Sequence, residues 1–489
     1  MVGSIEDVGR ALHILREEGP KYGLNLNEDK TEVFCPGARS LSADDQAALF
    51  QSIPEYSWNT SGVKLLGGFI GETEFIQKKV KEKVEKVHLL VKDVLELKDP
   101  HRQITLMRYC LSGYKIGHIL RTTNPDFYPT EISEFDTMIN DALSIILDLD
   151  FQTPALRETL GLPFNLGGMG ITSASIIARA SFYASRVQTS QMQTLLMNLN
   201  QEYSIERMNE AIERLNTIHQ LPVALEMIDL AVPHPQRNIV RIICENQASL
   251  LPNKLPPRQR ELLEARQSAD YVPWLAALPS EPLGFYMSPH QLRVAVKFQF
   301  GIETRRANCE QKLCEACGSM MDPFGAHGTK CHKEGGLTKR HNVTRDTLHK
   351  AVMESGKLSE IERKEILNDG TDKRPADVYI FNYSMTQAMA VDVAVVDGAT
   401  PNSIKNKEIE KRRKYLVDCA NNEILFSPFV LDSFGRIGAS GMKILCKLSF
   451  KYAETHDITV EQALWRLKMK MVMAMIREQS AQIIERGGG

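Results

Sequence analysis

Apolar residues recur at steps of three and four along much of the first two thirds of this chain. The clearest case is residues 73–97, where apolar side chains at 76, 80, 84, 87, 91 and 94 alternate with lysines and glutamates. This spacing predicts a long helix with one core face and one solvated face, ended by Pro100. Residues 5–20 predict a shorter helix of the same kind, and residues 101–230 a mostly helical region.

Several segments break this helical pattern. Residues 30–34 predict a strand, and residues 63–71 a second strand with a glycine interruption, where a bulge or a close backbone approach is expected. Residues 162–170, with the sequence LPFNLGGMG, predict a loop inside the helical region. Residues 231–290 are rich in proline and predict connectors around short helices.

The last third of the chain changes character. Two β-type runs, residues 376–381 and 388–396, lie between predicted helices at about 341–355 and 403–421. A third strand is predicted at 423–431, followed by helices from about 442 and over about 460–485. This order predicts a small mixed sheet. With 489 residues, the chain is expected to be a multidomain α/β protein of three or four domains, largely helical in its N-terminal and middle regions.

Four residues near position 320 have the spacing of a zinc site: Cys314, Cys317, His327 and Cys331. Two thiolates separated by two residues face one ion from a tight turn, and the later pair completes a tetrahedral set. Such a closed set is expected to be structural. The alternatives are free cysteines beside a surface histidine, or a set in which Cys309 or His332 replaces one ligand.

Composition limits the location and the partners of the protein. Nine cysteines with one cluster favour reduced thiols and a metal site over a disulfide framework. The start of the chain has no signal-peptide pattern and no apolar run is long enough for a bilayer, so a nuclear or cytoplasmic protein that is neither secreted nor in a membrane is expected. The net charge of −2 means that any nucleic-acid surface must be local.

Two aspartates are the strongest candidates for chemistry. Asp377 begins the first predicted β-run and Asp392 lies inside the apolar second one. A carboxylate in an apolar strand is costly to bury unless it is paired or binds a metal. If the two runs form a hairpin, both acids reach one sheet edge and form a site for Mg²⁺ or Mn²⁺. The alternative is that Asp377 caps a turn and Asp392 pairs with a lysine.

Cations gather on the helix after the second aspartate. Three lysines spaced to share one face are candidates to reach the acids: Lys407, Lys411 and Lys414. Lys407 and three neighbours are candidates to hold a nucleic-acid backbone: Lys405, Arg412 and Arg413. The alternative is an ordinary solvated helix face.

Two further cations, Arg340 and His341, open the helix that follows the cysteine cluster and are expected to contact nucleic acid. Asp346, on the first turns of the same helix, is a candidate for a further metal-binding carboxylate. The alternative for Asp346 is an acid favoured by the helix dipole.

Taken in order, these motifs resemble a known family. The cysteine–histidine set, Arg340-His341-Asn342, Arg374-Pro375-Ala376-Asp377, Asp392 and Lys411-x-x-Lys414-Tyr415 are similar to the restriction-enzyme-like endonuclease domain of early-branching non-long-terminal-repeat retrotransposons, over residues 305–450. The resemblance implies a PD-(D/E)XK-like nuclease in which the acids bind a divalent ion, a lysine assists cleavage and the zinc knuckle helps to bind nucleic acid. The wider superfamily has a lysine two residues after the second acid, where Ala394 stands here; Lys411 or Lys414 would take its role.

The front of the chain resembles a reverse transcriptase. Residues 23–27 with Lys30-Thr31-Glu32 are similar to late palm motifs, and residues 65–68 to a primer-grip turn. The implied division is a palm remnant at 1–72, a thumb-like helical region at 73–160, a helical linker at 161–300, a zinc knuckle at 301–338, a restriction-endonuclease-like domain at 339–455 and a C-terminal helix and tail at 456–489. The paired aspartates of such polymerases would precede the first helix, and Glu6-Asp7 is a poor substitute. We expect no polymerisation by this polypeptide alone, whether it is a truncated product, a fragment or a descendant that kept the nuclease end.

The predicted function is therefore metal-dependent nicking of a DNA target, with structural Zn²⁺, catalytic Mg²⁺ or Mn²⁺, and element RNA as a possible second partner. No oligomeric state is predicted. Two alternatives remain: a zinc-dependent nucleic-acid-binding protein without catalysis, and a polymerase remnant that only folds.

Overall fold

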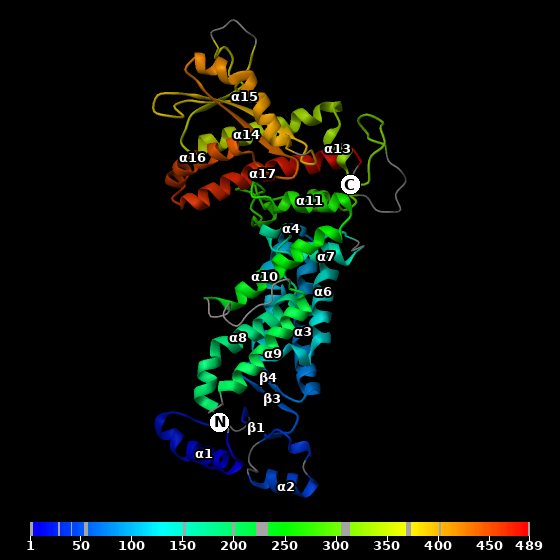
Figure 1. Cartoon of the computed structure of the whole chain (residues 1–489), viewed down its shortest axis with the longest axis vertical. Coiled ribbons are helices and arrows are strands. Elements are labelled where there is room, and N and C mark those ends of the chain that lie inside the picture. The colour runs from blue at the N-terminus through cyan, green and yellow to red at the C-terminus, as the bar shows by residue number, and fades with distance from the viewer. Residues whose placement is uncertain are drawn as a thin grey trace. The chain divides into compact units, whose positions relative to one another are not determined.

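The computed structural model describes residues 3–27, 30–40, 42–52, 57–149, 153–197, 201–221, 233–304, 313–367, 373–400 and 402–487 (Figure 1). Within these residues the protein is mostly helical, with a mixed four-stranded sheet in its C-terminal part. The chain forms two compact units, each assembled from separated segments: residues 1–90, 113–138 and 173–243 form the first, and residues 91–112, 139–172 and 244–489 the second. The six-part division expected above stays a prediction.

The first unit begins with α1, Ile5–Glu18, which Ser4 caps by accepting a hydrogen bond from the backbone N–H of Asp7. The parallel strands β1, Glu32–Phe34, and β2, Ser57–Asn59, follow, with α2, Ala43–Ser52, between them. The predicted helix over 5–20 and strand over 30–34 are thus present.

The single strand expected over residues 63–71 is wrong, because the chain reverses in the middle of it. Strands β3, Gly62–Leu65, and β4, Gly68–Gly71, form an antiparallel hairpin. Both turn residues, Leu66 and Gly67, have positive φ, as a tight type I′ turn requires. The expected close approach does occur, since a Cβ on Gly67 would lie 2.8 Å from Nε2 of His118.

The predicted long helix is α3, Thr73–Glu96, and its apolar stripe is buried from Ile76 to Val91. It ends earlier than Pro100, where Lys98 adopts a left-handed conformation. Pro100 instead begins α4, Pro100–Cys110, with Asp99 as its cap. Proline suits the first turn of a helix because the N–H it lacks has no partner there.

The remaining helices of the first two thirds confirm the prediction of a mostly helical region. They are α5 Gly117–Thr122, α6 Pro129–Leu147, α7 Pro154–Gly161, α8 Ala174–Met197, α9 Gln201–His219, α10 Pro235–Leu250, α11 Pro257–Gln267 and α12 Pro289–Phe300. Within the proline-rich segment, prolines begin helices as well as interrupting them.

The predicted loop at residues 162–170 lies in the second unit and contains one 3₁₀ turn, Phe164–Leu166. Two buried arginines satisfy its carbonyls: Nε of Arg108 donates to Met169 O at 2.7 Å and Nε of Arg266 donates to Gly167 O at 2.8 Å. These bonds hold a backbone that makes no regular ladder of its own.

The C-terminal sheet has the order β5-β6-β7-β8, with strands Ser359–Ile361, Val378–Ile380, Met389–Val396 and Leu425–Asp432. The β5–β6 and β6–β7 pairs are antiparallel, and β7–β8 is parallel. Strand β5 had no counterpart in the sequence prediction, while β6, β7 and β8 fall on the predicted runs.

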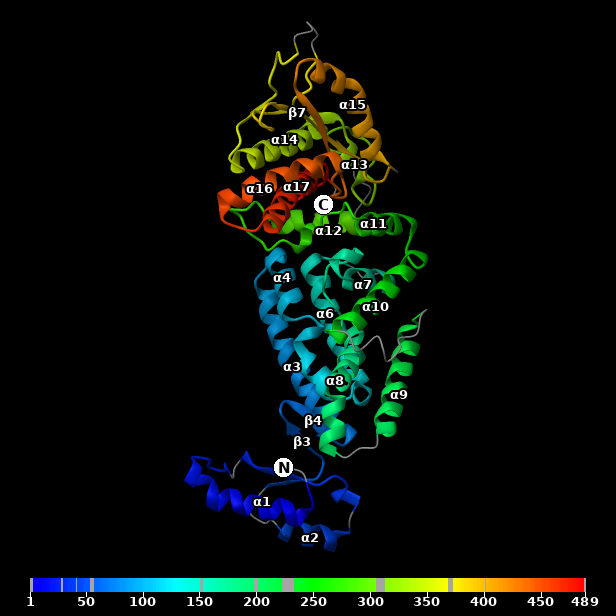
Figure 2. The same ribbon diagram turned by 60° about the vertical axis from the view of Figure 1, so that its left-hand side comes forward.

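The helices of this region pack on the sheet or on one another. They are α14 Gly336–Glu354, α15 Ser403–Asn421, α16 Ala439–His456 and α17 Val460–Glu485. Helix α15 packs on β7 and β8, and α14 on β5, β6 and β7, so that β7 lies between α14 and α15 (Figure 2). Ala390 of β7 packs with Tyr415 and Cys419 of α15 in one buried cluster. Helix α14 begins about five residues earlier than predicted.

The last helix, α17, belongs to the second unit. It packs against α12, α13 (Ala326–Lys330), α14 and α16. None of the described helices is long and apolar enough to cross a lipid bilayer.

Candidate functional site

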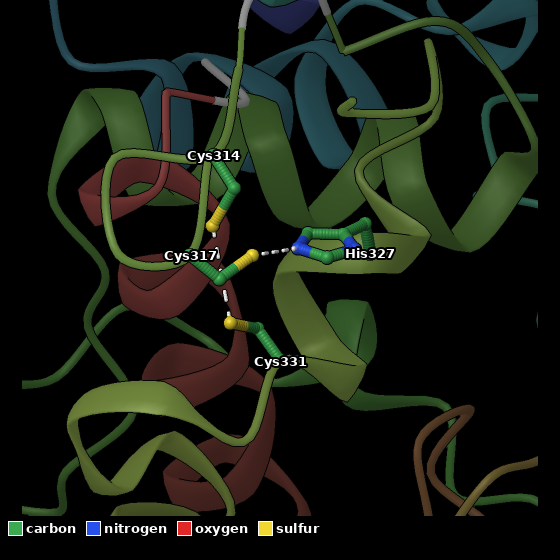
Figure 3. Close-up of side chains that lie close together, drawn as sticks. All are labelled: Cys314, Cys317, His327 and Cys331. Atoms are coloured by element: carbon green, nitrogen blue, oxygen red, sulfur yellow. Dashed lines mark hydrogen bonds between the residues drawn. The ribbon is translucent and has the colours of Figure 1, made fainter. Parts of the chain in front are cut away.

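The four residues with zinc-site spacing lie together in the structure (Figure 3). The sulfurs of Cys314 and Cys331 are 3.9 Å apart, and the Cys317 sulfur is 3.2 Å from Nε2 of His327. All four ligand atoms lie within 4.8 Å of one another. Tetrahedral zinc with bonds of about 2.3 Å to sulfur places its ligand atoms a little under 4 Å apart. The cluster could therefore bind a zinc ion.

Local backbone geometry explains why these four residues meet. A bridge between Leu313 and Met320 closes a tight turn, and Gly318 takes the left-handed conformation that the turn needs. The turn holds the first two ligands, Cys314 and Cys317. The carboxylate of Asp322 then accepts hydrogen bonds from three backbone N–H groups, those of residues 324, 326 and 327. This carboxylate fixes the start of α13, a one-turn helix that places His327 and Cys331 four residues apart on one face.

The thiols of the cluster differ in acidity. Hydrogen bonds from the side chain and backbone of Ser319 lower the pKa of Cys317 to about 6, whereas burial raises the pKa of Cys314. Metal-binding cysteine is a thiolate, and Cys317 is more readily deprotonated than Cys314. His332 is exposed and lies outside the cluster, and Cys309 falls in residues 305–312, outside the described part of the chain.

A second cluster forms around the two predicted aspartates. The antiparallel register pairs Val378 with Val391, so the preceding residue, Asp377, stands opposite Asp392 on the neighbouring strand. One carboxylate oxygen of Asp377 accepts a hydrogen bond of 2.7 Å from the backbone N–H of Val393. The structure thus brings the two predicted acids side by side, with Asp392 only 4% exposed.

Lys411 is the lysine that reaches this pair. Its Nζ lies 2.8 Å and 3.0 Å from the two carboxylate oxygens of Asp392. The alternative in which Asp392 pairs with a lysine is therefore seen in the structure. The partner of Asp392 is Lys411, a lysine that the metal-site interpretation requires as well. Lys414 is exposed and lies over the ring of its neighbour Tyr415, at 4.6 Å from the ring centroid. Lys407 pairs with Glu410.

The two carboxylates differ strongly in acidity. Burial raises the pKa of Asp392 to about 6, although Lys411 acts in the opposite direction, and the charge of Asp377 raises it further. Burial also disfavours ionisation of Asp377, but His341 and the Val393 N–H outweigh it and lower the pKa of Asp377. Closely spaced carboxylates with divergent pKa values are typical of sites that bind cations or move protons.

The two cations expected at the start of α14 have different surroundings. Arg340 is only 6% exposed and its Nη2 donates to the carbonyl of Thr329 at 2.5 Å, so it points into the protein. This placement corrects the expectation that Arg340 contacts nucleic acid, because sequence position alone did not reveal its packing on α13. His341 instead joins the acids, with Nε2 3.3 Å from a carboxylate oxygen of Asp377.

The remaining predicted residues lie away from the acid pair. Asp346 pairs with Arg345 at 2.8 Å, so it is not a third carboxylate of the cluster. Arg412 donates to the Ser440 hydroxyl at 2.8 Å. The side chains of Lys405 and Arg413 are exposed and form no hydrogen bond or ion pair with any described residue.

One neighbour of the acid pair, Glu362, and its partner Arg345 were missed from the sequence. The backbone N–H of Glu362 donates to the Asp377 carbonyl at 3.0 Å, and the Glu362 carboxylate pairs with Arg345. The sequence signal for Glu362 was weak, because the preceding strand β5 is three residues long and shows no clear alternation of polar and apolar residues. Arg345 follows His341 by four residues on one helix face. This spacing is the only sequence pattern that could have indicated Arg345.

No protein-family model and no curated protein sequence matches this chain. Any function proposed for it therefore rests on the geometry of its side chains.

Proposed function

We propose that the C-terminal part of this protein is an endonuclease that nicks DNA with the help of Mg²⁺ or Mn²⁺. The observation that carries the proposal is the meeting of Asp377, just before β6, with Asp392 of β7 and Lys411 of α15. Two carboxylates beside a positioned amine are the groups that metal-dependent phosphodiester hydrolysis needs.

Each residue has a distinct task in this proposal. Asp377 and Asp392 supply the hard oxygen ligands that Mg²⁺ and Mn²⁺ prefer. The bound ion would polarise the scissile phosphate and make a water molecule more acidic. Lys411 supplies a fixed positive charge next to Asp392, where it can stabilise negative charge on the phosphate. His341 orients Asp377 through the contact described above.

The finer fold assignment, a PD-(D/E)XK-like nuclease of the retrotransposon type, is also a proposal. In support of it, Ala394 is buried on β7 where the wider superfamily carries its lysine, and Lys411 brings an amine to the same carboxylate from α15. The shifted lysine agrees with the branch that the sequence motifs resemble.

The proposed partners follow from the exposed cations of α15. Lys405, Arg413 and Lys414 are available for phosphate contacts, which give affinity without sequence preference. DNA is the proposed substrate in the nucleus, and element RNA is a possible second ligand. The Cys₃His centre would hold Zn²⁺ in a structural role, and we propose no polymerisation by this chain alone.

Plasmid nicking by the full chain tests the proposal. Supercoiled DNA with Mg²⁺ is incubated with wild type, Asp377→Asn, Asp392→Asn and the control Asp418→Asn. Asp418 is a matched control, because it lies on α15 and pairs with Lys373 at 2.6 Å, away from the acid pair. We expect a loss of at least about 100-fold in the first two variants and wild-type nicking in the control. Equal nicking by all four proteins would rule out this active site.

A second candidate is a zinc-dependent nucleic-acid-binding protein without catalysis. The Cys₃His geometry favours it, because that centre needs none of the acids. It predicts salt-sensitive binding that survives Asp377→Ala and Asp392→Ala but fails after Cys314→Ser, with no nicking by wild type.

A further inference from the structure

Three consecutive residues of α13 are fixed to three different elements. A Cβ on Gly328 would lie 3.1 Å from Cα of Ile483, so α13 sits directly on α17. The carbonyl of Thr329 accepts the Arg340 hydrogen bond from α14. Nζ of Lys330 lies 2.7 Å from the carboxylate of Asp397, just after β7. All three residues lie between His327 and Cys331, two of the four candidate zinc ligands.

The segments that Thr329 and Lys330 contact are those that lead to the acid pair. On α14, the residue after Arg340 is His341, which contacts Asp377. On β7, Asp397 follows the end of the strand that contains Asp392. The cysteine–histidine centre is thus connected to Asp377 through Arg340 and His341, and to Asp392 through Asp397 and the last residues of β7.

Arg340 is unusually dependent on this connection. Its guanidinium is buried, and its Nε has no hydrogen-bond partner among the described residues. Burial lowers the pKa of Arg340 to about 10, with Asp397 and Glu478 acting in the opposite direction. A buried cation whose hydrogen bond goes to a carbonyl of α13 keeps its position only while α13 keeps its own.

Helix α13 has only five residues, too few to be stable by itself. A metal that binds His327 and Cys331 would fix both of its ends. The metal would thereby add a constraint on the Thr329 carbonyl and the Lys330 ammonium, beside those that the Asp322 carboxylate and α17 already supply.

We propose that occupancy of the Cys₃His centre controls how tightly the Asp377–Asp392 pair binds a divalent cation, with Arg340 as the positioning residue. This inference rests on the proposed function, because it assumes that the acid pair binds Mg²⁺ or Mn²⁺. Coupling between sites is reciprocal, so a cation at the acid pair must tighten zinc binding by the same factor.

Mn²⁺ binding to the full chain, measured by the electron paramagnetic resonance signal of free Mn²⁺, tests the coupling. Zinc-loaded wild type is compared with zinc-stripped wild type, Arg340→Met, Arg340→Lys and Lys330→Met. Lys333→Met and Lys339→Met are matched controls: Lys333 is exposed beside α13, and Lys339 forms a surface pair with Glu485.

We expect zinc removal and Arg340→Met each to weaken Mn²⁺ binding about tenfold, a typical strength for coupled sites. Arg340→Lys should restore part of the loss, Lys330→Met should show a smaller loss, and both controls should match wild type. A competing zinc chelator should show zinc held about tenfold more tightly at saturating Mn²⁺, which a merely structural role of Arg340 does not produce.

The outcomes separate two failures. If wild type binds no Mn²⁺ with or without zinc, the proposed nuclease centre is wrong and the coupling falls with it. If Mn²⁺ binds equally well to wild type, zinc-stripped protein and Arg340→Met, the nuclease proposal stands and the coupling is wrong. Should Arg340→Met fail to fold, Lys330→Met on the surface decides: an affinity equal to wild type overturns the inference.

Discussion

The ammonium of Lys411 contacts both carboxylate oxygens of Asp392, at 2.8 Å and 3.0 Å, although the two residues come from α15 and β7. Asp392 is buried and Lys411 is 18% exposed at its side chain. The pair therefore joins a helix to a central strand through charges that water screens poorly.

Replacing Lys411 with methionine tests both roles of this contact. Without the ammonium, Asp392 is left buried beside Asp377, so Lys411→Met should unfold at lower urea, with a loss of about 1–3 kcal/mol at pH 7. The loss should be smaller at pH 5, where Asp392 is largely protonated. Nicking should fall by at least about 100-fold. Lys451→Met, which removes an exposed lysine of α16 that pairs with Glu454, should change neither quantity, and a similar effect of both variants would contradict the assignment.

The opposite pKa shifts of the two aspartates predict opposite dependences of stability on pH. The pKa of Asp392 is raised from 3.8 to about 6, so its contribution is complete below about 4 and is lost as pH rises through 6. Asp392→Asn removes this loss. Its free energy of unfolding relative to wild type should therefore rise by roughly 3 kcal/mol from pH 4 to pH 7, less the cost of leaving Lys411 without its partner. Urea unfolding at several pH values measures it.

Asp377 should behave in the reverse way. Its pKa is lowered in the folded protein, so its contribution is present above the pKa of an unfolded aspartate and is lost as pH falls through the folded value. Asp377→Asn should therefore lose stability relative to wild type at pH 7 and lose little at acid pH. Parallel pH profiles for Asp377→Asn and Asp392→Asn would contradict this account of the pair.

Sequence patterns predicted the C-terminal elements well, because β7 is a continuous apolar run and α15 and α17 are long. They missed β5, which has three residues, and the true start of α14, where Gly335 replaces the usual side-chain cap. Short strands and uncapped helix starts depend on tertiary contacts that local patterns do not contain.

The acid pair followed from sequence, but the choice between Lys411 and Lys414 did not. The structure turns α15 so that Tyr415 and Cys419 are buried, and Lys411, four residues before Tyr415, then faces Asp392. Arg340 was misassigned for a related reason. Arg340 is buried and bonded to α13, a contact between segments whose packing a linear pattern cannot show.

The cysteine–histidine centre should make the protein hold about one zinc ion per chain. Cys331→Ser should lose that zinc and lower the melting temperature. The substitution removes a buried ligand, which directly follows α13 and whose sulfur lies next to that of Cys314. Cys110→Ser is a matched control, since Cys110 is exposed and lies outside the cluster. Elemental analysis with thermal unfolding measures both effects. Full zinc content in Cys331→Ser would exclude the proposed ligand set.

The loop at residues 162–170 should tolerate no side chain at Gly168. A Cβ there would lie 2.0 Å from the carbonyl oxygen of Leu162, a backbone atom that cannot move aside. Gly168→Ala should therefore destabilise the protein by more than about 2 kcal/mol in urea unfolding. Gly117→Ala is the control, because a Cβ on this helical residue meets nothing within 4 Å and alanine favours helix by up to about 1 kcal/mol. Equal stability of the two variants would show that the loop does not pack around Gly168 as described.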